Sequence, residues 1–272
     1  EGMAGSDTIS GYIETVLEAE DLAAIVLRVN SPGGSVFASD LIRRKLSEVA
    51  DAGIPIVVSM GTVAASGGYW IAAEADEIWA LPTTLTGSIG AFTAFPTIEG
   101  IAEYIGVTVD GVGTTPLAGA ASFNRGLSPE MASIVQALAY GAYDDFIELV
   151  ASGRGMSEQA VRDVADGLVW TGAEAADRGL VDELGGLDEA VAAAARLAGV
   201  EEWRTARTRV PASFESLLLK ELSGSFGIVA AAPLGGWFES LVSAFKPAIE
   251  SLSSLRDPMH LYAQCLACAP LL

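Results

Sequence analysis

The sequence has 272 residues, of which 51% are hydrophobic and 30 are glycine, enough for one large domain or for one domain with an appendage. This composition excludes an intrinsically disordered chain. Fifteen Lys and Arg residues stand against 35 Asp and Glu, which gives a formal net charge of −20. A surface of that charge repels polyanions, so the sequence argues against nucleic-acid binding and against steering towards anionic lipid headgroups.

The first ten residues, EGMAGSDTIS, have neither the basic start nor the apolar run of a signal peptide. We interpret them as the exit from a strand, and the chain as a fragment whose N-terminal portion is absent. Apolar, β-branched runs and runs with helical spacing then alternate along the chain. The expected elements are strands at 22–30, 54–59, 77–81 and 107–112, and helices at 39–52 and 67–75.

The second half of the chain is predicted to be mostly helical. Helices are expected at 129–152, 157–165, 172–178 and 187–198, with a short strand near Val181. Together with the earlier strands, this order predicts an α/β fold with a mainly parallel sheet and helices on both faces.

The region after residue 200 has a different pattern. It shows no clear strand and contains amphipathic pieces at 214–222 and 237–255, so we expect a helical C-terminal extension over 201–272 that follows a domain over 1–200. No apolar run approaches the roughly 18 residues that indicate a membrane-spanning helix.

Two glycine-rich segments follow the two strands predicted at 22–30 and 54–59. The first is Asn30-Ser31-Pro32-Gly33-Gly34-Ser35, and the second runs from Met60 to Trp70 and contains Ser66-Gly67-Gly68. Loops at the carboxyl ends of parallel strands meet in one crevice. Ser66 opens a predicted helix, where free N–H groups favour a developing negative charge, and bare glycine amides can approach a carbonyl closely. The pair therefore predicts a nucleophile and an oxyanion hole.

Each segment also has a simpler interpretation. A lone Ser-Gly-Gly at a helix start is usually an N-cap, and Pro-Gly-Gly is usually a turn. A dinucleotide-binding loop would require GxGxxG after a strand, and neither segment contains it. Taken as a pair at this spacing, the two segments favour the catalytic interpretation.

The two segments, VLRVNSPGGSVFASDLIRRKL and PIVVSMGTVAASGGYWIAAEADEIWALPTTLTGSIGAF, resemble the signal peptide peptidase A (protease IV) family of serine proteases. The similarity continues through GLVWTGAEAADRGLVDELGGLDEAV to the closing RDPMHLYAQCLACA, and the chain looks like the C-terminal, serine-bearing repeat of the long form. The resemblance implies a fold like that of crotonase and Clp protease, an N-terminally truncated peptidase domain over 1–200, and no cofactor or metal. It implies Ser66 as the nucleophile and the backbone of Gly33, Gly34 and Gly67 as the oxyanion hole.

The family uses a Ser-Lys dyad, and this chain departs from it at the lysine. Short members carry the lysine after the strand that resembles GVTVD, where this sequence has Thr114-Thr115-Pro116-Leu117-Ala118-Gly119. Long members take it from the N-terminal repeat, which we expect to be missing here. Ser88 matches the family serine that hydrogen-bonds the lysine and holds it in place. We therefore expect the chain alone to be inactive, because general-base assistance contributes about 10²–10⁴ in rate.

The other basic and thiol groups are weaker candidates. Lys45 lies in Arg43-Arg44-Lys45 and is expected on a solvated helix face, and Lys220 and Lys246 lie in the tail without a supporting motif. His260, the single histidine, is expected in surface or interface packing. Cys265 and Cys268 form a C-x-x-C that lacks a second ligand pair for zinc, and either a disulfide or two free thiols remain open. Tyr69 and Trp70 are expected in the core beneath the nucleophile, with the alternative that one lines the cleft.

The resemblance implies an endopeptidase that degrades signal peptides and other apolar peptides at the periplasmic face of the bacterial inner membrane. Its partners would be the N-terminal repeat of the same protein and further copies in a homotetramer. Two alternatives stay open, a crotonase-type acyl-CoA enzyme and a non-catalytic assembly half. The net charge of −20 disfavours binding of the CoA phosphates, and intact Ser66 and Ser88 disfavour a decayed site.

Overall fold

Strand β3 (Ile56–Ala65) is the central strand of the main sheet, and every residue of it except Thr62 is buried. The computed structural model describes residues 5–115, 117–120, 122, 124–208 and 261–264. Strand β1 (Ile25–Ser31) pairs with β3 on one edge. Strands β4 (Glu77–Ala80) and β5 (Leu85–Gly87) pair with the first and second halves of its other edge.

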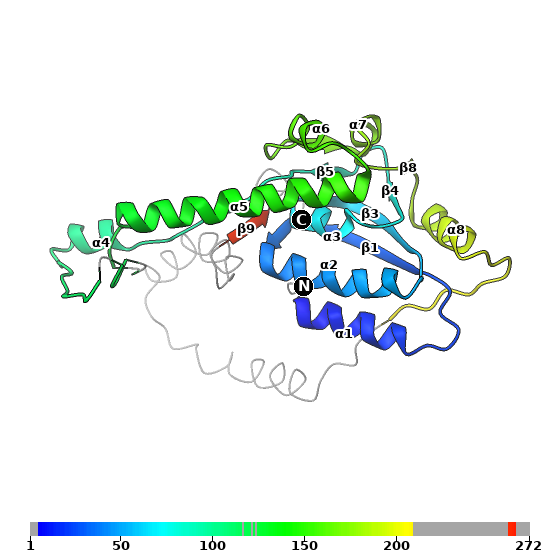
Figure 1. Cartoon of the computed structure of the whole chain (residues 1–272), viewed down its shortest axis with the longest axis horizontal. Helices are drawn as coiled ribbons and strands as arrows, with labels where there is room; N and C mark the ends of the chain where they lie inside the picture. The colour runs from blue at the N-terminus through cyan, green and yellow to red at the C-terminus, as the bar shows by residue number, and fades with distance from the viewer. Residues whose placement is uncertain (1–4, 116, 121, 123, 209–260, 265–272) are drawn as a thin grey trace, which may run out of the picture.

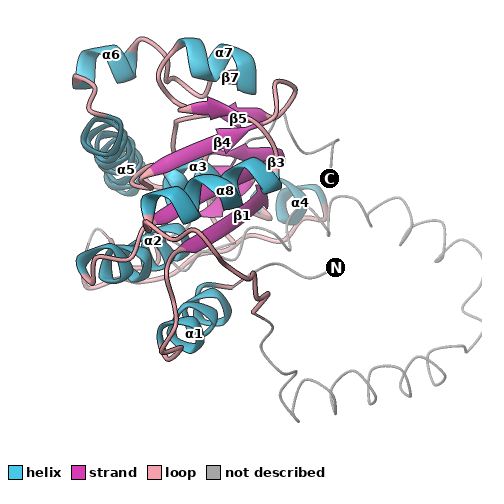
Figure 2. Cartoon of the chain, turned by 90° about the vertical axis from the view of Figure 1, so that its right-hand side faces the viewer, coloured by secondary structure: helices cyan, strands magenta, loops and turns pink. Residues whose placement is uncertain are grey.

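The main sheet is mixed but mostly parallel. Strand β8 (Glu183–Leu184) extends it parallel to β4, and β7 (Val169–Thr171) pairs antiparallel with β5. Helices cover both faces, as expected from the alternating pattern (Figure 2). Their bounds are α1 Ser6–Leu17, α2 Val36–Asp51, α3 Gly67–Ala72, α4 Glu99–Tyr104, α5 Pro129–Arg154, α6 Glu158–Arg162, α7 Gly172–Asp177 and α8 Leu187–Leu197.

The core is divided by the sheet because neighbouring strand residues point to opposite faces. Val57 faces α8 and packs with Ala190 and Ala194. Val58 belongs to the larger cluster on the other face, where Tyr69 of α3 and Phe146 of α5 are also fully buried. The catalytic candidates belong to the layer built around α3.

A second, three-stranded sheet lies beside α3. It consists of β2 (Gly33–Ser35), β9 (Leu261–Gln264) and β6 (Phe92–Thr93), with β9 in the middle and antiparallel to both neighbours. Figure 1 shows β9 in red beside the cyan α3, although the two are far apart in the sequence.

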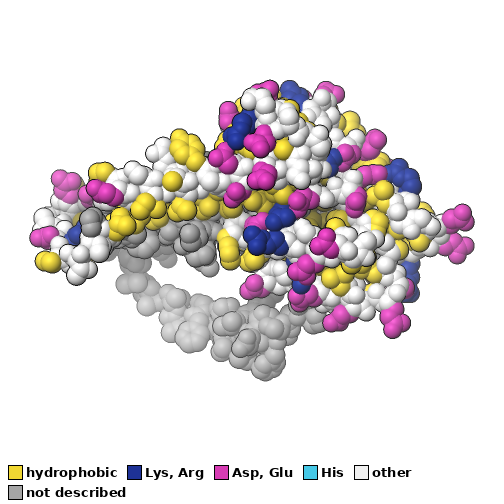
Figure 3. All heavy atoms as spheres, in the orientation of Figure 1, with side chains coloured by type: hydrophobic (Ala, Val, Ile, Leu, Met, Phe, Trp, Pro, Cys, Tyr) yellow, Lys and Arg dark blue, Asp and Glu magenta, His cyan; other side chains and the backbone are white. Residues whose placement is uncertain are grey.

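An arm projects away from the two sheets. It contains α4 and the first half of α5, which extend to the left in Figure 1. Large apolar side chains remain exposed along it, and Figure 3 shows them as a yellow band over α5. They include Ile101 at 66% exposure, Tyr104 at 92%, Ile105, Ile134, Leu138 and Tyr140.

The structure confirms the α/β architecture with a mainly parallel sheet and helices on both faces. Most expected elements are present with shifted ends, and α2 begins three residues earlier because Ser35 caps it by accepting from the Ala38 amide at 3.0 Å. The strand near Val181 lies at Glu183–Leu184.

Three sequence-based expectations were wrong. Residues 107–112 form no strand and are exposed, so their alternation of apolar and polar residues does not reflect a buried sheet face. Ser6–Leu17 is a helix on α2, not the exit from a strand. The C-terminal region contains β9, although no strand was expected there; the helices predicted at 214–222 and 237–255 lie outside the described residues.

Candidate active site

Ser66 stands at a sharp turn between β3 and α3. Its backbone has φ 53° and ψ −116°, a region that side-chain-bearing residues rarely adopt. Two hydrogen bonds hold the turn: the Ser66 amide donates to the Gly87 carbonyl at 2.8 Å, and the Trp70 amide donates to the Ser66 carbonyl at 2.8 Å. Strain of this kind costs about 1–3 kcal/mol and persists where the surroundings enforce it, which is common at active sites.

Ser88 lies at the corresponding point of the neighbouring strand. Ala65 of β3 is paired with Gly87 of β5, so Ser66 and Ser88 follow a matched pair at the carboxyl ends of two parallel strands. Ser88 also has a positive φ, 50°, and its amide donates to the Leu168 carbonyl at 2.7 Å. The structure therefore places both predicted serines at the ends of paired neighbouring strands.

The Pro-Gly-Gly segment approaches the same turn. A Cβ atom at Gly67 would lie 3.1 Å from the Gly34 amide nitrogen and 2.6 Å from the Ser39 hydroxyl, so only glycine fits at this position. Gly33 has φ 104°, and its amide donates to the Ser31 hydroxyl at 3.2 Å. Gly34 and Gly67 are thus the two glycines whose backbones converge beside Ser66.

Two polar residues before Pro-Gly-Gly hold the two glycine loops, and neither role was predicted from the sequence. The Asn30 side-chain oxygen accepts from the Val63 amide at 3.2 Å, and it would lie 2.6 Å from a Cβ atom at Gly61. Ser31 holds Gly33 through the bond given above. Their position at a strand end, directly before the glycines, is the signal that could have identified them.

The site is covered. Ser66 is only 1% exposed and Ser88 only 6%. Strand β9 passes directly over the turn, because the Ala263 carbonyl oxygen would lie 2.9 Å from a Cβ atom at Gly67. Tyr262 and Ala263 are both fully buried.

Lys45 is the single lysine among the described residues, and it is bound by carboxylates. Its ammonium lies 2.8 Å from Glu48 and 3.0 Å from Glu14. Hydrogen bonds to Glu48 and then Glu14 raise the pKa of Lys45, which is the opposite of what a neutral base requires. Lys220, Lys246, His260, Cys265 and Cys268 lie outside the described residues.

Tyr69 and Trp70 pack in the core behind the turn, as expected. Tyr69 is fully buried, its hydroxyl donates to the Leu180 carbonyl at 2.7 Å, and burial raises the pKa of its phenol. Trp70 is 4% exposed and its ring centroid lies 4.6 Å from that of Phe146. Its indole Nε1 is buried without a hydrogen-bond partner.

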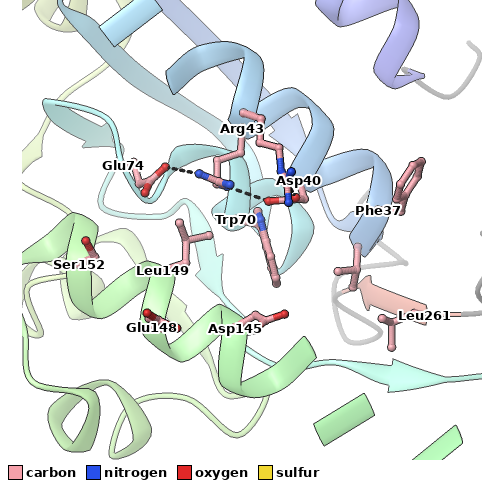
Figure 4. A pocket seen from close by; sticks show the side chains of 12 residues that line it. Phe37, Asp40, Arg43, Trp70, Glu74, Asp145, Glu148, Leu149, Ser152 and Leu261 are labelled. Carbon is pink, nitrogen blue, oxygen red and sulfur yellow. Dashed lines mark hydrogen bonds and ion pairs between the residues drawn. The ribbon is translucent and has the colours of Figure 1, made fainter. Parts of the chain in front are cut away.

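Trp70 also borders a cavity of about 520 Å³ between α2, α3 and α5 (Figure 4). Charged side chains line one part of it, where Asp40 binds Arg43 at 2.9 Å and Arg44 at 2.6 Å. Although burial acts to raise it, the hydrogen bonds from Arg43 and Arg44 lower the pKa of Asp40. Leu261 of β9 lines the same cavity, whereas Ser66 does not.

Within the ranges that the structure describes, no group of three or more His, Cys, Asp or Glu residues could hold a metal ion. Over those same ranges, no helix combines the length and the apolar character needed to cross a bilayer.

The sequence profile of Peptidase family S49 matches residues 48–201, which include Ser66, Ser88 and the intervening strands. That match covers more than half of the chain. The chain belongs to Peptidase family S49. The resemblance drawn from the two glycine-rich segments is therefore confirmed at the level of the family.

Relatives within family S49 extend the similarity to nearly the whole chain. Protease 4 of Salmonella typhi is 42% identical over 273 residues, which are 98% of this chain and 44% of that protein. Protease 4 of Haemophilus influenzae is 39% identical, with 97% and 44% covered. The chain thus spans less than half the length of these two relatives. A putative signal peptide peptidase SppA of Enterococcus faecium is 35% identical over 66% of this chain and 52% of its own length.

Among solved structures, a point mutant of ClpP1 from Listeria monocytogenes aligns with a TM-score of 0.46 and 17% identity, over 68% of this chain and 86% of that chain.

Proposed function

We propose that this S49 chain is the serine-bearing part of a Ser-Lys endopeptidase that cleaves apolar peptides, including signal peptides left after secretion. Ser66 is the nucleophile. Its lysine partner is supplied by an N-terminal repeat outside residues 1–272, and Ser88 holds that lysine in place. The observation that carries the proposal is the strained turn at Ser66, directly beside the converging backbones of Gly34 and Gly67.

In the proposed reaction the Ser66 hydroxyl attacks the carbonyl carbon of the peptide bond while neutral lysine accepts its proton. The carbonyl oxygen becomes an oxyanion, and backbone amides of Gly34 and Gly67 stabilise it; removing one such donor typically costs about 10²–10³ in rate. Gly33 was also expected in the oxyanion hole, but its amide already donates to Ser31, so in this proposal it shapes the loop instead. The lysine then protonates the leaving amine. Water next attacks the acyl group on Ser66, the lysine accepts a proton from that water, and the proton passes to the Ser66 oxygen as the acid product leaves.

The surroundings of Lys45 and of Ser66 both favour a catalytic lysine from outside residues 1–272. Lys45 has a raised pKa and two carboxylate partners, so it is unsuited to act as the base. A dyad lysine must lose roughly three pKa units to be neutral near pH 7, which costs about 4 kcal/mol and requires an apolar surrounding. The turn at Ser66 and Ser88 is buried, so a lysine inserted there would be desolvated.

We further propose that the working enzyme is a homotetramer at the periplasmic face of the bacterial inner membrane. The apolar side chains of the arm support association, since they form an exposed band over α4 and α5 (Figure 3). The relatives named signal peptide peptidase and Protease 4 support the substrate class. The acidic surface supports peptides rather than polyanions as substrates.

The test compares this chain alone with a longer protein that carries the upstream repeat. Hydrolysis of an apolar peptide and labelling by a fluorophosphonate are measured in both, with Ser66→Ala and the exposed Ser133→Ala as a matched pair. The longer protein should react at Ser66, Ser133→Ala should behave as wild type, and Ser66→Ala should lose both signals. Activity that survives Ser66→Ala contradicts the nucleophile, and Ser66-dependent hydrolysis by the chain alone contradicts the external lysine.

A further inference from the structure

The central strand β3 contains a bulge halfway along its length. On the edge that faces β1, Val29 is opposite Met60 and Ser31 is opposite Ala64. One residue of β1, Asn30, therefore faces three residues of β3, where regular pairing would place one. Bulges of this kind interrupt the ladder and are common next to active sites, where they change the direction of a side chain.

The other edge of β3 is interrupted at the same place. Strand β4 pairs with Val57, Val58 and Ser59, and the pairing with β5 begins only at Val63. Within the described chain, residues 61 and 62 therefore have no strand partner on either edge. The part of β3 that leads into the Ser66 turn is thus separated from the regular part of the strand.

Two threonines hold the bulge on the side of β5. The Thr84 hydroxyl donates to the Gly61 carbonyl at 2.7 Å, and the Thr86 hydroxyl donates to the Ala64 carbonyl at 2.6 Å. Thr84 is 1% exposed and Thr86 is fully buried. Because water is excluded from both hydrogen bonds, they fix this side of the bulge firmly.

Asn30 holds the bulge on the side of β1. Its side-chain oxygen accepts from the Val63 amide at 3.2 Å, so the side chain supplies an acceptor where the backbone ladder is interrupted. The same oxygen would lie 2.6 Å from a Cβ atom at Gly61, so the side chain packs directly on that glycine. Asn30 is otherwise exposed, which means that it does not serve to fill the core.

Asn30 also lies where the nucleophile strand meets the glycine loop. The next residue, Ser31, pairs with Ala64 and accepts from the Gly33 amide at 3.2 Å. Ala64 lies two residues before Ser66. The position of Ser66 relative to the glycine loop therefore depends on how the bulge is held.

We propose that Asn30 is a positioning residue, which sets the distance between the Ser66 hydroxyl and the oxyanion-hole amides by holding the Val63 amide across the bulge. This inference rests on the proposed role of Ser66. A misplacement of about 1 Å in a catalytic group can cost about 10²-fold in rate. Because the buried threonines keep the other side of the bulge in place, loss of the Asn30 contact should shift the turn without unfolding the protein.

The first experiment compares Asn30→Leu with Asn30→Asp in the longer protein that carries the upstream repeat. Leucine has nearly the shape of asparagine but no acceptor, whereas aspartate keeps an oxygen that can accept from the Val63 amide. Asn30→Leu should lower kcat on an apolar peptide and the rate of fluorophosphonate labelling at Ser66 by about tenfold to a hundredfold, with KM unchanged. Asn30→Asp should retain most of both rates.

Asn124→Leu is the matched control for this comparison. Asn124 is exposed in the loop before α5, so its replacement should leave both rates at the wild-type value. Wild-type rates in Asn30→Leu, equal losses in Asn30→Leu and Asn30→Asp, or a loss confined to KM overturn the positioning role while leaving Ser66 as the nucleophile. No labelling of Ser66 in the wild type overturns the proposed function and this inference with it.

A double-mutant cycle tests the same contact from the other strand. Gly61 has no positive φ, so alanine suits its backbone, but the new methyl group would displace the Asn30 side chain. Gly61→Ala and Asn30→Gly should each slow labelling of Ser66. The double variant should be no slower than the slower single variant, because both changes remove one shared contact. Losses that multiply overturn the inference.

Hydrogen exchange provides a measurement that does not depend on activity. In Asn30→Leu the Val63 amide loses its acceptor, so it should exchange at least about tenfold faster than in the wild type. The amide of Val58, in the regular part of β3, should exchange at the same rate in both proteins. Equal protection of the Val63 amide in both proteins contradicts the proposed contact.

Discussion

The amide of Ser66 donates a 2.8 Å hydrogen bond to the carbonyl oxygen of Gly87, the residue directly before Ser88. The two serines lie at the ends of paired parallel strands, and both have φ near +50°, at 53° and 50°. The bond to Gly87 therefore ties the strained turn at Ser66 to the strand that carries Ser88.

Replacing Ser88 tests its positioning role. In the longer protein that carries the upstream repeat, Ser88→Ala should lower kcat on an apolar peptide about tenfold to a hundredfold, less than the loss of the base itself, with KM unchanged. Ser88→Gly removes the same hydroxyl but suits the positive φ. It should therefore lose the same activity while its Tm stays at or above that of Ser88→Ala. A wild-type kcat in both variants would contradict the role.

Replacing Gly67 or Gly141 with alanine should change the stability of the protein in opposite directions. In Gly67→Ala the new methyl group would meet Ser39, Ala263 and Gly34 at 2.6–3.1 Å, so the variant should lose activity and several degrees in Tm. Gly141 is exposed inside α5 with nothing within 4 Å, so Gly141→Ala should gain about 0.5–1 kcal/mol. Thermal unfolding measures the stability of both variants, and peptide hydrolysis is measured in the longer protein that carries the upstream repeat. A fully active Gly67→Ala would contradict the close approach.

Lys45→Met tests whether the described lysine takes part in catalysis. Its ammonium is held by Glu48 and Glu14, and both raise its pKa. In the longer protein that carries the upstream repeat, we expect Lys45→Met to show fluorophosphonate labelling of Ser66 and peptide hydrolysis at wild-type rates, with a small decrease in Tm from the lost ion pairs. A loss of labelling with Tm preserved would identify Lys45 as the base and remove the need for an external lysine.

The architecture and Ser66 could be predicted because local patterns determine them, whereas Ser88 was identified only through the resemblance to the family. The buried run of β3, the glycines after it and the helix that follows are all encoded within residues 56–72. The pairing that aligns Ser66 with Ser88 was not predicted, because β5 (Leu85–Gly87) was not among the expected strands and its pairing with β3 is a tertiary contact. Membership of family S49 then agrees with motifs that are contiguous in the sequence.

Strand β9 could not be predicted, because it depends on contacts with β2 and β6 that are remote in the sequence. Leu261–Gln264 is too short for a periodic pattern, and its pairing partners have only three and two residues. Residues 107–112 show the opposite case: they alternate as a strand would, but they pair with no strand of the described chain and remain exposed. The covering of Ser66 is likewise a tertiary property.

The buried phenol of Tyr69 should make the free energy of unfolding depend on pH in the alkaline range. Burial raises the pKa of its phenol in the folded protein, whereas a tyrosine in the unfolded chain titrates near about 10. Below pH ~10 the phenol is protonated in both states. Above it, only the unfolded chain releases the proton, so the free energy of unfolding falls as pH rises, by up to about 1.4 kcal/mol per pH unit from this group.

Tyr69→Phe should remove that alkaline component. It also deletes the 2.7 Å hydrogen bond to the buried Leu180 carbonyl, so at pH 7 the free energy of unfolding should fall by about 1–3 kcal/mol. Tyr104→Phe, at a site 92% exposed, is the control and should match wild type at pH 7. Denaturant titrations at pH 7 and at several values above pH 10 measure both effects. Because Tyr69 lies directly after the Ser66-Gly67-Gly68 turn, an unchanged alkaline slope in Tyr69→Phe would mean that this part of the core opens before the protein unfolds.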